Sequence, residues 1–521
     1  MELCPAYRNA RAKSGNAWKN GRLWKGHMVI GMNEKDQEIL YPTKQIGKEM
    51  TADLKENLAA MKEILSPDIS YDIVYRVIQI GGRDACLFFV DGFCKDEMMQ
   101  KILQYLIGLK PEDIPTDAHG MSKGFMPTVE VDLGQTWDEI VTGLLSGQTV
   151  LFLDGFSKCL LIDSRTYPAR SVSEPEKEKG LRGSKDGFVE TIVFNTALVR
   201  RRIRSPKLRM EMMRVGETSK TDIAVCYMED RVDHKLLCQI RTRIQNIHVD
   251  ALTMNQESLA ECLYQGKWFN PFPKFKYTER PDTAAAHILE GNIIVFVDNS
   301  PSAMVLPVSI FDMTEEADDY YFPPVTGTYL RFSRTIIGII TYLLTPTFLL
   351  LTMYPEWLPK WFSFVAIADD VNVPVLLQFL ILELSLDGLK LAAVNTPNML
   401  STPLSVTAGI VLGEFAVKSG WFNSEVMLYM AFVAIANYTQ SNYELGYALK
   451  FMRIITLVLT GIAGVWGYAA GVLFFIISIA CNRTIAGRSY INPFGPGGMG
   501  TLWKRFIRVR QEAAGNRQAS K

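Results

Sequence analysis

The distribution of apolar residues divides the chain into a long mixed part and a shorter, strongly apolar part. Charged residues of both signs run through residues 1–334. Long apolar runs then follow at 335–353, 373–394 and 454–480. Runs of this length are typical of helices that cross a bilayer. The pattern therefore predicts a polar head followed by an all-α polytopic transmembrane domain.

The polar head has the pattern of an α/β fold. Residues 45–66 carry apolar side chains at helical spacing, and 98–109 form a second amphipathic segment. Between them, 71–80 and 85–94 are typical of two strands joined by a turn, and 149–156 is typical of a buried strand. Helical and strand periods that alternate along a chain favour an α/β architecture.

Two segments of the head repeat one another. LLSGQTVLFLD (144–154) aligns without gaps on ILEGNIIVFVD (288–298), and each is typical of a helix end, a glycine, a buried strand and an aspartate in a turn. The repeat predicts two related lobes, at about 66–170 and 185–312; chance similarity between fragments of an α/β protein is the alternative. Ordinary turn chemistry explains the recurring Asp91, Asp154 and Asp298.

These patterns predict five regions. They are a basic disordered arm (1–45), a first cytoplasmic α/β lobe (46–175), a linker-helix with a second cytoplasmic lobe (176–325), a transmembrane helical domain (326–485) and a cytoplasmic basic tail (486–521).

Basic residues on both sides of the apolar block predict its orientation. Arg331 and Arg334 precede the first run, and Lys504 and Arg505 follow the last. Positive flanks remain in the cytoplasm, so both termini are expected there and the number of crossings should be even. Four crossings are favoured. Because 448–481 is too long for one simple span, six crossings or re-entrant segments remain open.

The composition argues against several functions. The chain has 55 basic and 55 acidic residues, so it has no overall attraction to nucleic acid. Its cysteines and histidines are not clustered, which predicts no metal site. The segment GLRGSKDG (180–187) lacks the spacing of a phosphate-binding loop, and no Ser/His/Asp set or catalytic dyad stands out. We therefore expect neither an enzyme nor a cofactor.

The second apolar run carries charged residues. Glu383, Asp387 and Lys390 lie at i, i+4 and i+7 and therefore on one face of a helix. Ionisable groups at membrane depth are costly, so they usually line a pathway or a contact between proteins. This face is a candidate ion pathway. The alternative is internal ion pairing, of Asp387 with Lys390 and of Glu383 with an arginine such as Arg453.

A further apolar segment, 403–417, carries small residues four positions apart. Such faces let helices pack closely, which is the first interpretation. The second interpretation is a pore helix with an apolar constriction and an acidic mouth, which a chain with so few spans could form only as an oligomer. The packing residues are Ser405, Gly409 and Gly413, the constriction residues are Val406, Ile410 and Val411, and the mouth residue is Glu414.

The linker-helix shows a resemblance to a known family. EPEKEKGLRGSKDGFVETIVFNTALVRRRI (174–203) resembles the core motif of the A subunits of bacterial spore germinant receptors, the GerA family, and especially its sporulation branch. LELSLDGLKLAAV, TPLSVTAGIVLGEFAVKSGWFNS and SNYELGYALKFMR are similar to the family's membrane segments, so the resemblance covers about 70–505. The matching motif positions are Glu174, Pro175, Arg182, Gly183, Gly187, Phe188, Glu190, Asn195, Arg200, Arg201 and Arg202.

Two features depart from the family. The arm and the helix at 45–66 have no clear counterpart, and the acidic pair is Glu383 and Asp387 where two glutamates are expected.

The resemblance implies a function in germination. It implies a multi-pass subunit of the spore inner membrane that forms an oligomeric, pentameric cation channel. The implied partners are a small polytopic membrane protein, other germination receptor subunits and the lipid bilayer, with no nucleic acid. A nonconducting scaffold or nutrient-receptor subunit is the alternative. A secondary transporter would need roughly ten spans with inverted repeats, more than this block supplies.

Overall fold

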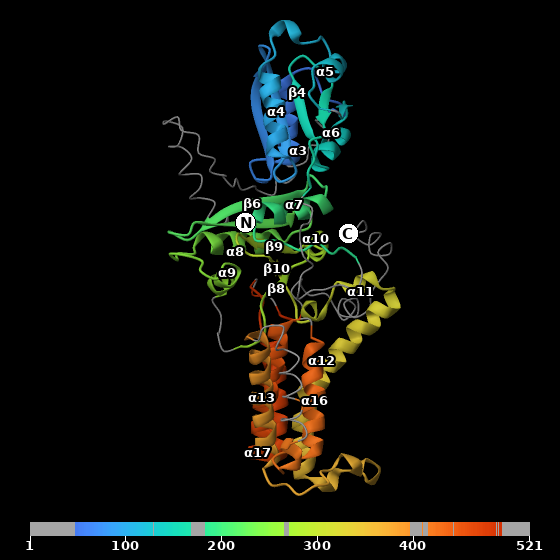
Figure 1. Ribbon diagram of the computed structural model, residues 1–521. Coiled ribbons are helices and arrows are strands. Elements are labelled where there is room, and N and C mark those ends of the chain that lie inside the picture. Colours follow the sequence, from blue (N-terminus) through green and yellow to red (C-terminus); the bar gives the residue numbers. More distant parts are fainter. Residues whose placement is uncertain are drawn as a thin grey trace. The chain divides into compact units, whose positions relative to one another are not determined.

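The computed structural model describes residues 47–128, 130–167, 183–264, 270–395, 409, 415–440, 442–485, 487 and 489–491. The chain forms two compact units (Figure 1). The first unit, here called the head, comprises the residues up to Gln265 together with Tyr277–Pro307. The second, here called the helical unit, comprises Gly266–Lys276 and the residues from Val308 onward.

The boundary between these units differs from the predicted one. The head ends at Pro307 and not at 325. Within the helical unit, Asp319 is fully buried against Arg334, and this ion pair joins the segment before the first long helix to that helix. The predicted arm (1–45) and most of the predicted tail (486–521) lie outside the described residues.

The first lobe of the head is a three-layer α/β sandwich. Its five strands are antiparallel neighbours in the order β1-β2-β4-β5-β3. Its elements are α3 (Leu54–Leu65), β1 (Ile73–Ile80), β2 (Arg83–Val90), α4 (Asp96–Ile107), α5 (Ala118–Gly124), β3 (Val131–Gly134), α6 (Trp137–Leu145), β4 (Thr149–Leu153) and β5 (Cys159–Ile162).

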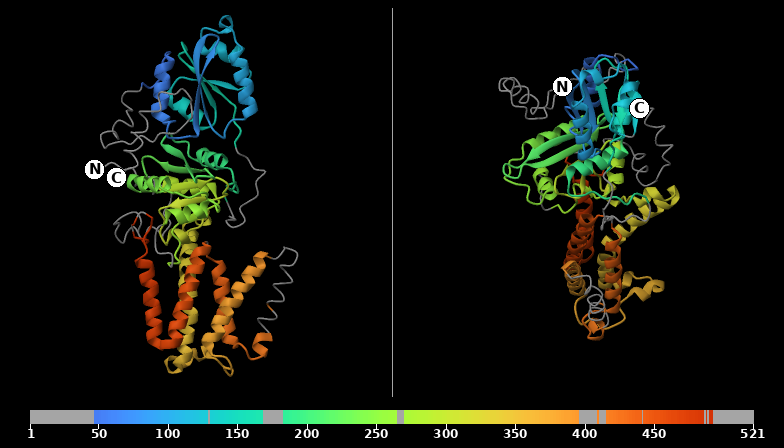
Figure 2. Two further views of the ribbon diagram at one scale, coloured as in Figure 1. Left: turned by 90° about the vertical axis from the view of Figure 1, so that its left-hand side faces the viewer. Right: turned by 45° about the horizontal axis from the view of Figure 1, so that its top comes forward.

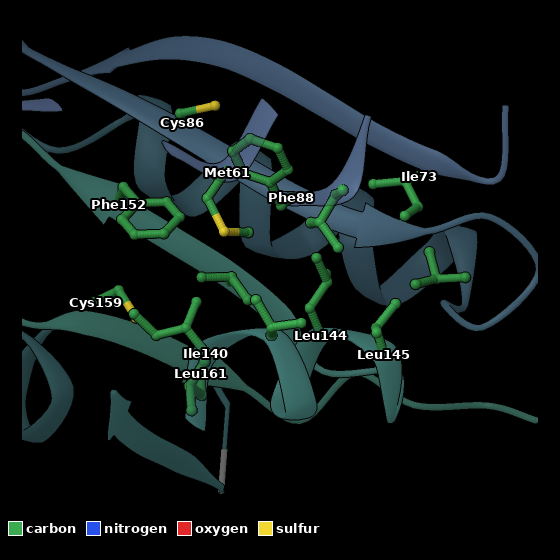
Figure 3. Close-up of a cluster of buried hydrophobic side chains, with 14 of the residues drawn as sticks. Met61, Ile73, Cys86, Phe88, Ile140, Leu144, Leu145, Phe152, Cys159 and Leu161 are labelled. Atoms are coloured by element: carbon green, nitrogen blue, oxygen red, sulfur yellow. The ribbon is translucent and has the colours of Figure 1, made fainter. Parts of the chain in front are cut away.

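The two faces of this sheet bury separate cores. Successive strand residues point to opposite faces, so Phe88 packs with Met61 of α3 on one face (Figure 3). Its neighbour Leu87 packs with Ile102 of α4 on the other face. Both faces are covered by helices, which explains why β4 and β5 are buried at every position.

The second lobe has the same topology as the first. Its strand order is β6-β7-β9-β10-β8, and each strand has the position of its counterpart in the first sheet. Its elements are α7 (Ile192–Arg202), β6 (Leu208–Val215), β7 (Thr221–Met228), α8 (His234–Gln245), α9 (Gln256–Leu263), β8 (Lys276–Thr278), α10 (Pro281–Leu289), β9 (Ile293–Val297) and β10 (Ala303–Leu306). The predicted internal repeat is therefore confirmed as a structural repeat.

The repeated aspartates do more than form turns. The Asp154 carboxylate accepts a hydrogen bond of 3.2 Å from the backbone N–H of Leu54, the first residue of α3. In the second lobe, Asp298 accepts a hydrogen bond of 3.2 Å from the N–H of Ile192, the first residue of α7. A carboxylate at a helix N-terminus satisfies an unpaired N–H and favours the helix dipole. Each lobe thus uses its strand-end aspartate to hold its first helix.

In its described residues, the helical unit has four main helices, α12 (Pro324–Met353), α13 (Val375–Asn395), α16 (Ser424–Tyr438) and α17 (Tyr443–Ala480). Two of them, α12 and α17, are long and apolar enough to cross a membrane. The shorter elements of this unit are η3 (Asp312–Thr314), α11 (Asp318–Tyr321), η4 (Pro355–Trp357), η5 (Lys360–Val365) and α15 (Ala416–Lys418).

Within α17 the chain reverses direction at Gly464. This residue has φ 55° and ψ −128°, a backbone conformation that favours glycine. A Cβ atom on Gly471 would lie 2.7 Å from the Thr456 side chain, although 15 helical residues span about 22 Å. The two arms, 443–463 and 465–480, therefore pack against each other as a hairpin, which Figure 2 shows on the left. This explains why the last apolar run is too long for one span.

Candidate functional site

Four charged residues of the apolar block form one cluster. Glu383 and Asp387 lie one turn apart on α13, and Lys450 and Arg453 lie three residues apart on α17. Residues with these spacings share a helix face. Two carboxylates therefore meet two cations, and the cluster has no net formal charge.

The centre of the cluster is the pair of Glu383 and Arg453. Arg453 Nε donates a hydrogen bond of 2.7 Å to Glu383 Oε1, and Arg453 Nη1 donates one of 3.2 Å to the carbonyl oxygen of Thr341 on α12. Arg453 is fully buried and Glu383 is 3% exposed. The pairing of Glu383 with Arg453, one of the two sequence interpretations, is thus present in the structure, and it ties three helices together.

Lys450 occupies the place that the sequence interpretation gave to Lys390. Its Nζ forms an ion pair with Asp387 and donates a hydrogen bond of 3.2 Å to the carbonyl oxygen of Glu383. Lys390 instead lies over the rings of Tyr438 and Tyr447, with its Nζ 5.6 Å and 5.7 Å from the two ring centres. The expected pairing of Asp387 with Lys390 was therefore wrong. A lysine on the neighbouring helix reaches the carboxylate, while Lys390 interacts with aromatic rings.

The cluster leaves some hydrogen-bonding capacity unused. Arg453 Nη2 lies 2.5 Å from Glu383 Oε1, so this nitrogen also pairs with that carboxylate. Among the described residues, Asp387 Oδ1 has no hydrogen-bond partner. On α12, the hydroxyl of Thr345 is likewise buried without one. Buried polar groups are usually satisfied, so these atoms mark a place where the helices can form other bonds.

Most of the predicted pore and packing segment lies outside the described residues. This holds for Ser405, Val406, Ile410, Val411, Gly413 and Glu414. Gly409 is described and exposed, and a Cβ atom placed there would meet nothing within 4 Å. Its predicted role in packing, like the ion pathway itself, stays a prediction.

A second charged cluster lies at the start of α12. Arg331 Nη1 is 2.8 Å from Glu315 Oε1, and Arg334 pairs with the fully buried Asp319. Arg331 is 4% exposed and Arg334 is 8% exposed. These two arginines are therefore buried inside the protein, where acidic residues just before α12 neutralise them.

The family-motif residue Arg200 lies at the junction of the two lobes. Arg200, at the end of α7, donates hydrogen bonds of 2.7 Å and 3.2 Å to the two carboxylate oxygens of Asp72 in the first lobe. The same guanidinium donates to the carbonyl oxygens of Ser205 and Leu208 in the second lobe. Arg200 is fully buried and Asp72 is 2% exposed. This bidentate pair links the lobes.

The neighbouring tyrosine supports the junction. The Tyr71 hydroxyl lies 2.5 Å from the hydroxyl of Thr196 on α7, and its backbone N–H donates a hydrogen bond of 3.0 Å to the carbonyl oxygen of Met210 on β6. Burial raises the pKa of Tyr71 well above its usual value. The tyrosine therefore stays neutral and remains a hydrogen-bonding group.

The other arginines of the motif have different contacts. Arg202 forms an ion pair of 2.5 Å with Asp186. Burial raises the pKa of that carboxyl group, but hydrogen bonds from Arg202 and Ser184 outweigh this and lower it. Arg201 lies over the ring of Tyr167, with its guanidinium carbon 4.4 Å from the ring centre.

The remaining motif residues hold the start of α7. Asn195 accepts a hydrogen bond of 2.8 Å from the N–H of Val189 and donates one of 2.5 Å to its carbonyl oxygen. The Glu190 carbonyl oxygen accepts a hydrogen bond of 2.8 Å from the N–H of Asn299. Phe188 packs edge-on against Phe296 at 5.0 Å between ring centres. Gly183 has a φ of 93° and Gly187 precedes Phe188, whereas Glu174, Pro175 and Arg182 lie outside the described residues.

Comparison with known proteins identifies the family. A model described as "Bacillus/Clostridium GerA spore germination protein" matches residues 59–520. The chain belongs to the GerA family. The predicted resemblance is thereby confirmed, and GerA membership places the chain among spore germination proteins.

Relatives within the GerA family support this. The chain is 35% identical to "Stage V sporulation protein AF" of Bacillus subtilis (strain 168), over 85% of this chain and 90% of the relative. It is 28% identical to "Spore germination protein GerLA" of Bacillus cereus, over 88% of this chain and 94% of that protein. The resemblance to the sporulation branch is confirmed by the first match.

One solved structure is similar in sequence. It is the N-terminal domain of the A subunit of the Bacillus megaterium spore germinant receptor GerK3, which is 28% identical, covers 50% of this chain and 97% of that chain, and superposes with a TM-score of 0.39.

Two residues of the site escaped sequence reasoning. Asp72 stands just before a strand in an ordinary polar context, so nothing local marks it as the partner of Arg200. Lys450 did carry a signal, because it lies three residues before Arg453 in the segment SNYELGYALKFMR and therefore on the same helix face. The described residues include no group of three or more histidine, cysteine or acidic side chains that could hold a metal ion.

Proposed function

We propose that this chain is a membrane subunit of a spore germination complex that contributes, as a pentamer, a pathway for monovalent cations across the spore inner membrane. The observation that carries the proposal is membership of the GerA spore germination family, together with two helices, α12 and α17, that are long and apolar enough to cross a membrane.

The topology that we propose has six crossings. Five described segments supply five of them, namely α12, α13, α16 and the two arms of α17. The predicted helix 403–417 would supply the sixth, and both termini would then lie in the cytoplasm. Its small and apolar residues would line a pore between copies, because one chain has too few helices to enclose one.

In this assembly the charged cluster sets the fold of each subunit. Because it is neutral and mostly buried, it would hold α13 and α17 together and leave conduction to the faces between subunits. The partners that we expect are a small polytopic membrane protein and other germination receptor subunits, and we expect no enzymatic activity.

A second candidate function is a nonconducting scaffold or receptor subunit that relays a signal from its head. One observation favours it: Lys450 and Arg453 neutralise the acidic pair, so this cluster offers passing cations no negative surface. The ion pair of Arg200 and Asp72, here called the latch, would then transmit movement between the two lobes.

Ion flux distinguishes the two functions. The protein is reconstituted with and without its small membrane partner in liposomes that contain a K⁺-sensitive dye. Under the channel proposal, Val411→Ala and Ile410→Ala change the K⁺ leak, because they resize the apolar constriction. Ile462→Ala is the matched control, since that side chain is 77% exposed on α17. If correctly inserted protein passes no K⁺ with or without the partner, the scaffold function replaces the channel.

A further inference from the structure

The helical unit contains a cavity that the proposed cation pathway does not use. It has a volume of about 480 Å³ and lies among the end of α12, the η4–η5 segment and the start of α13. Its floor includes Phe348, Leu349 and Val365, which are all buried. Cavities of this size are typical of small-molecule sites.

The side chains that line the cavity are almost all apolar. Thr352 is its only side chain with a polar atom, and that hydroxyl already donates a hydrogen bond of 2.7 Å to the carbonyl oxygen of Leu349. Gly461 of α17 closes one side, where a Cβ atom would lie 2.5 Å from Leu376. These side chains favour an apolar ligand group such as a hydrocarbon chain, because a buried polar group without a hydrogen-bond partner is costly.

The mouth of the cavity is exposed. Met353 is 42% exposed and Val371 is 49% exposed, and Ala366 is exposed beside them. Trp361 and Phe364, on η5, are more than three-quarters exposed. Exposed aromatic side chains at the end of apolar helices are typical of the membrane interface. An acyl chain could therefore enter from the bilayer.

The residues next to the mouth are mainly acidic. Glu356 follows the lining residue Pro355, and Asp369 and Asp370 precede the lining residue Val371. All three acidic residues are exposed, and Lys360 is the basic residue of the same loop. Charge complementarity thus favours an ammonium head group over a purely anionic one.

We infer that this cavity binds one acyl chain of an ammonium-headed lipid, with the head group at the acidic mouth. The site does not depend on cation conduction. A conducting channel and a nonconducting scaffold could each carry it.

The test uses the full-length protein in vesicles of phosphatidylethanolamine or phosphatidylglycerol. Each vesicle contains a small fraction of the same lipid with a diazirine near the end of one acyl chain. After illumination, mass spectrometry maps the adducts. We expect adducts to concentrate within 348–376 and to form more readily with the phosphatidylethanolamine probe.

Matched tryptophan variants decide whether the cavity holds the chain. Ala366→Trp fills the mouth and should lower these adducts about tenfold, the change that corresponds to a loss of ~1.4 kcal/mol of binding free energy. Ala368→Trp makes the same change at an exposed residue outside the lining and should leave them unchanged. Val371→Trp serves if Ala366→Trp does not fold, as judged by gel filtration.

Two results would overturn the inference. The first is an even spread of adducts over exposed apolar residues such as Leu384 and Ile462, or adducts that persist in the filled variants. The second concerns the head group: equal labelling by both lipids, or a preference that survives the combined Asp369→Asn and Asp370→Asn substitutions, would refute recognition by the acidic mouth. Neither result depends on whether K⁺ passes.

Discussion

The head and the helical unit each bury an arginine against a carboxylate, but they do so in different ways. In the head, Arg200 and Asp72 pair with each other, and among the described residues the guanidinium otherwise donates to backbone carbonyl oxygens. In the helical unit, Lys450 lies within reach of both Glu383 and Asp387, and one carboxylate oxygen of Asp387 has no hydrogen-bond partner among the described residues. The first arrangement fixes one geometry. In the second, Lys450 has two carboxylates within reach, so more than one pairing is available to it.

The largest expected effect comes from breaking the exclusive pair. Arg200→Met leaves Asp72 buried without a cation and should lower the free energy of unfolding of the head by about 3–5 kcal/mol. Thermal unfolding of the purified full-length protein measures this. The control is Arg201→Met at the adjacent residue, which is exposed and loses only a contact with Tyr167 worth about 0.5–1 kcal/mol. Equal losses in the two variants would contradict the latch.

The shared cluster should tolerate a comparable change better. Asp387→Asn removes one carboxylate, but Lys450 still lies 3.5 Å from Glu383 Oε2 and can pair with it. We expect a loss of about 1.5–3 kcal/mol, the range for hydrogen bonds to charged groups. Thermal unfolding in detergent provides the measurement. A loss as large as that of Arg200→Met would show that the partners do not exchange.

The next prediction concerns the hairpin of α17. Its two helical arms approach each other closely at Gly471. Gly471→Ala places a Cβ atom 2.7 Å from Thr456 and should cost about 1–3 kcal/mol through overpacking. Gly446→Ala, in the same helix, meets open space and should be neutral or slightly stabilising. The melting temperatures of the two variants are compared. Equal melting temperatures would contradict the packing of the two arms of α17 as a hairpin.

The smallest expected loss of stability comes from removing equivalent asparagines in the two lobes. Asn57 and Asn195 each bond both backbone groups of a residue six positions earlier. Asn57→Ala and Asn195→Ala should each cost about 0.5–2 kcal/mol, the range for lost helix caps. Chemical denaturation gives both values. The Asn195 variant should lose more, because that side chain also donates to the carbonyl oxygen of Ser300. If only one of the two variants lost stability, Asn57 and Asn195 would not have equivalent roles.

Local pattern was sufficient for much of the fold. The period of apolar residues distinguished the head from the apolar block, and the gapless match of 144–154 with 288–298 predicted two lobes that share one topology. Strand and helix periods are properties of neighbouring residues, so a sequence displays them directly. The family motif likewise consists of contiguous residues and could be recognised without coordinates.

Tertiary structure alone decided which charges meet. Arg200 and Asp72 are separated by 128 residues, and Arg453 and Glu383 by 70. The sequence favoured Lys390 as the partner of Asp387 because it is three residues away, whereas folding brought Lys450 closer. Ion pairing depends on distance in space, and α13 gains its cations only when α17 packs beside it. The sequence therefore determined the elements and their repeat, and the packing of the helices determined the site.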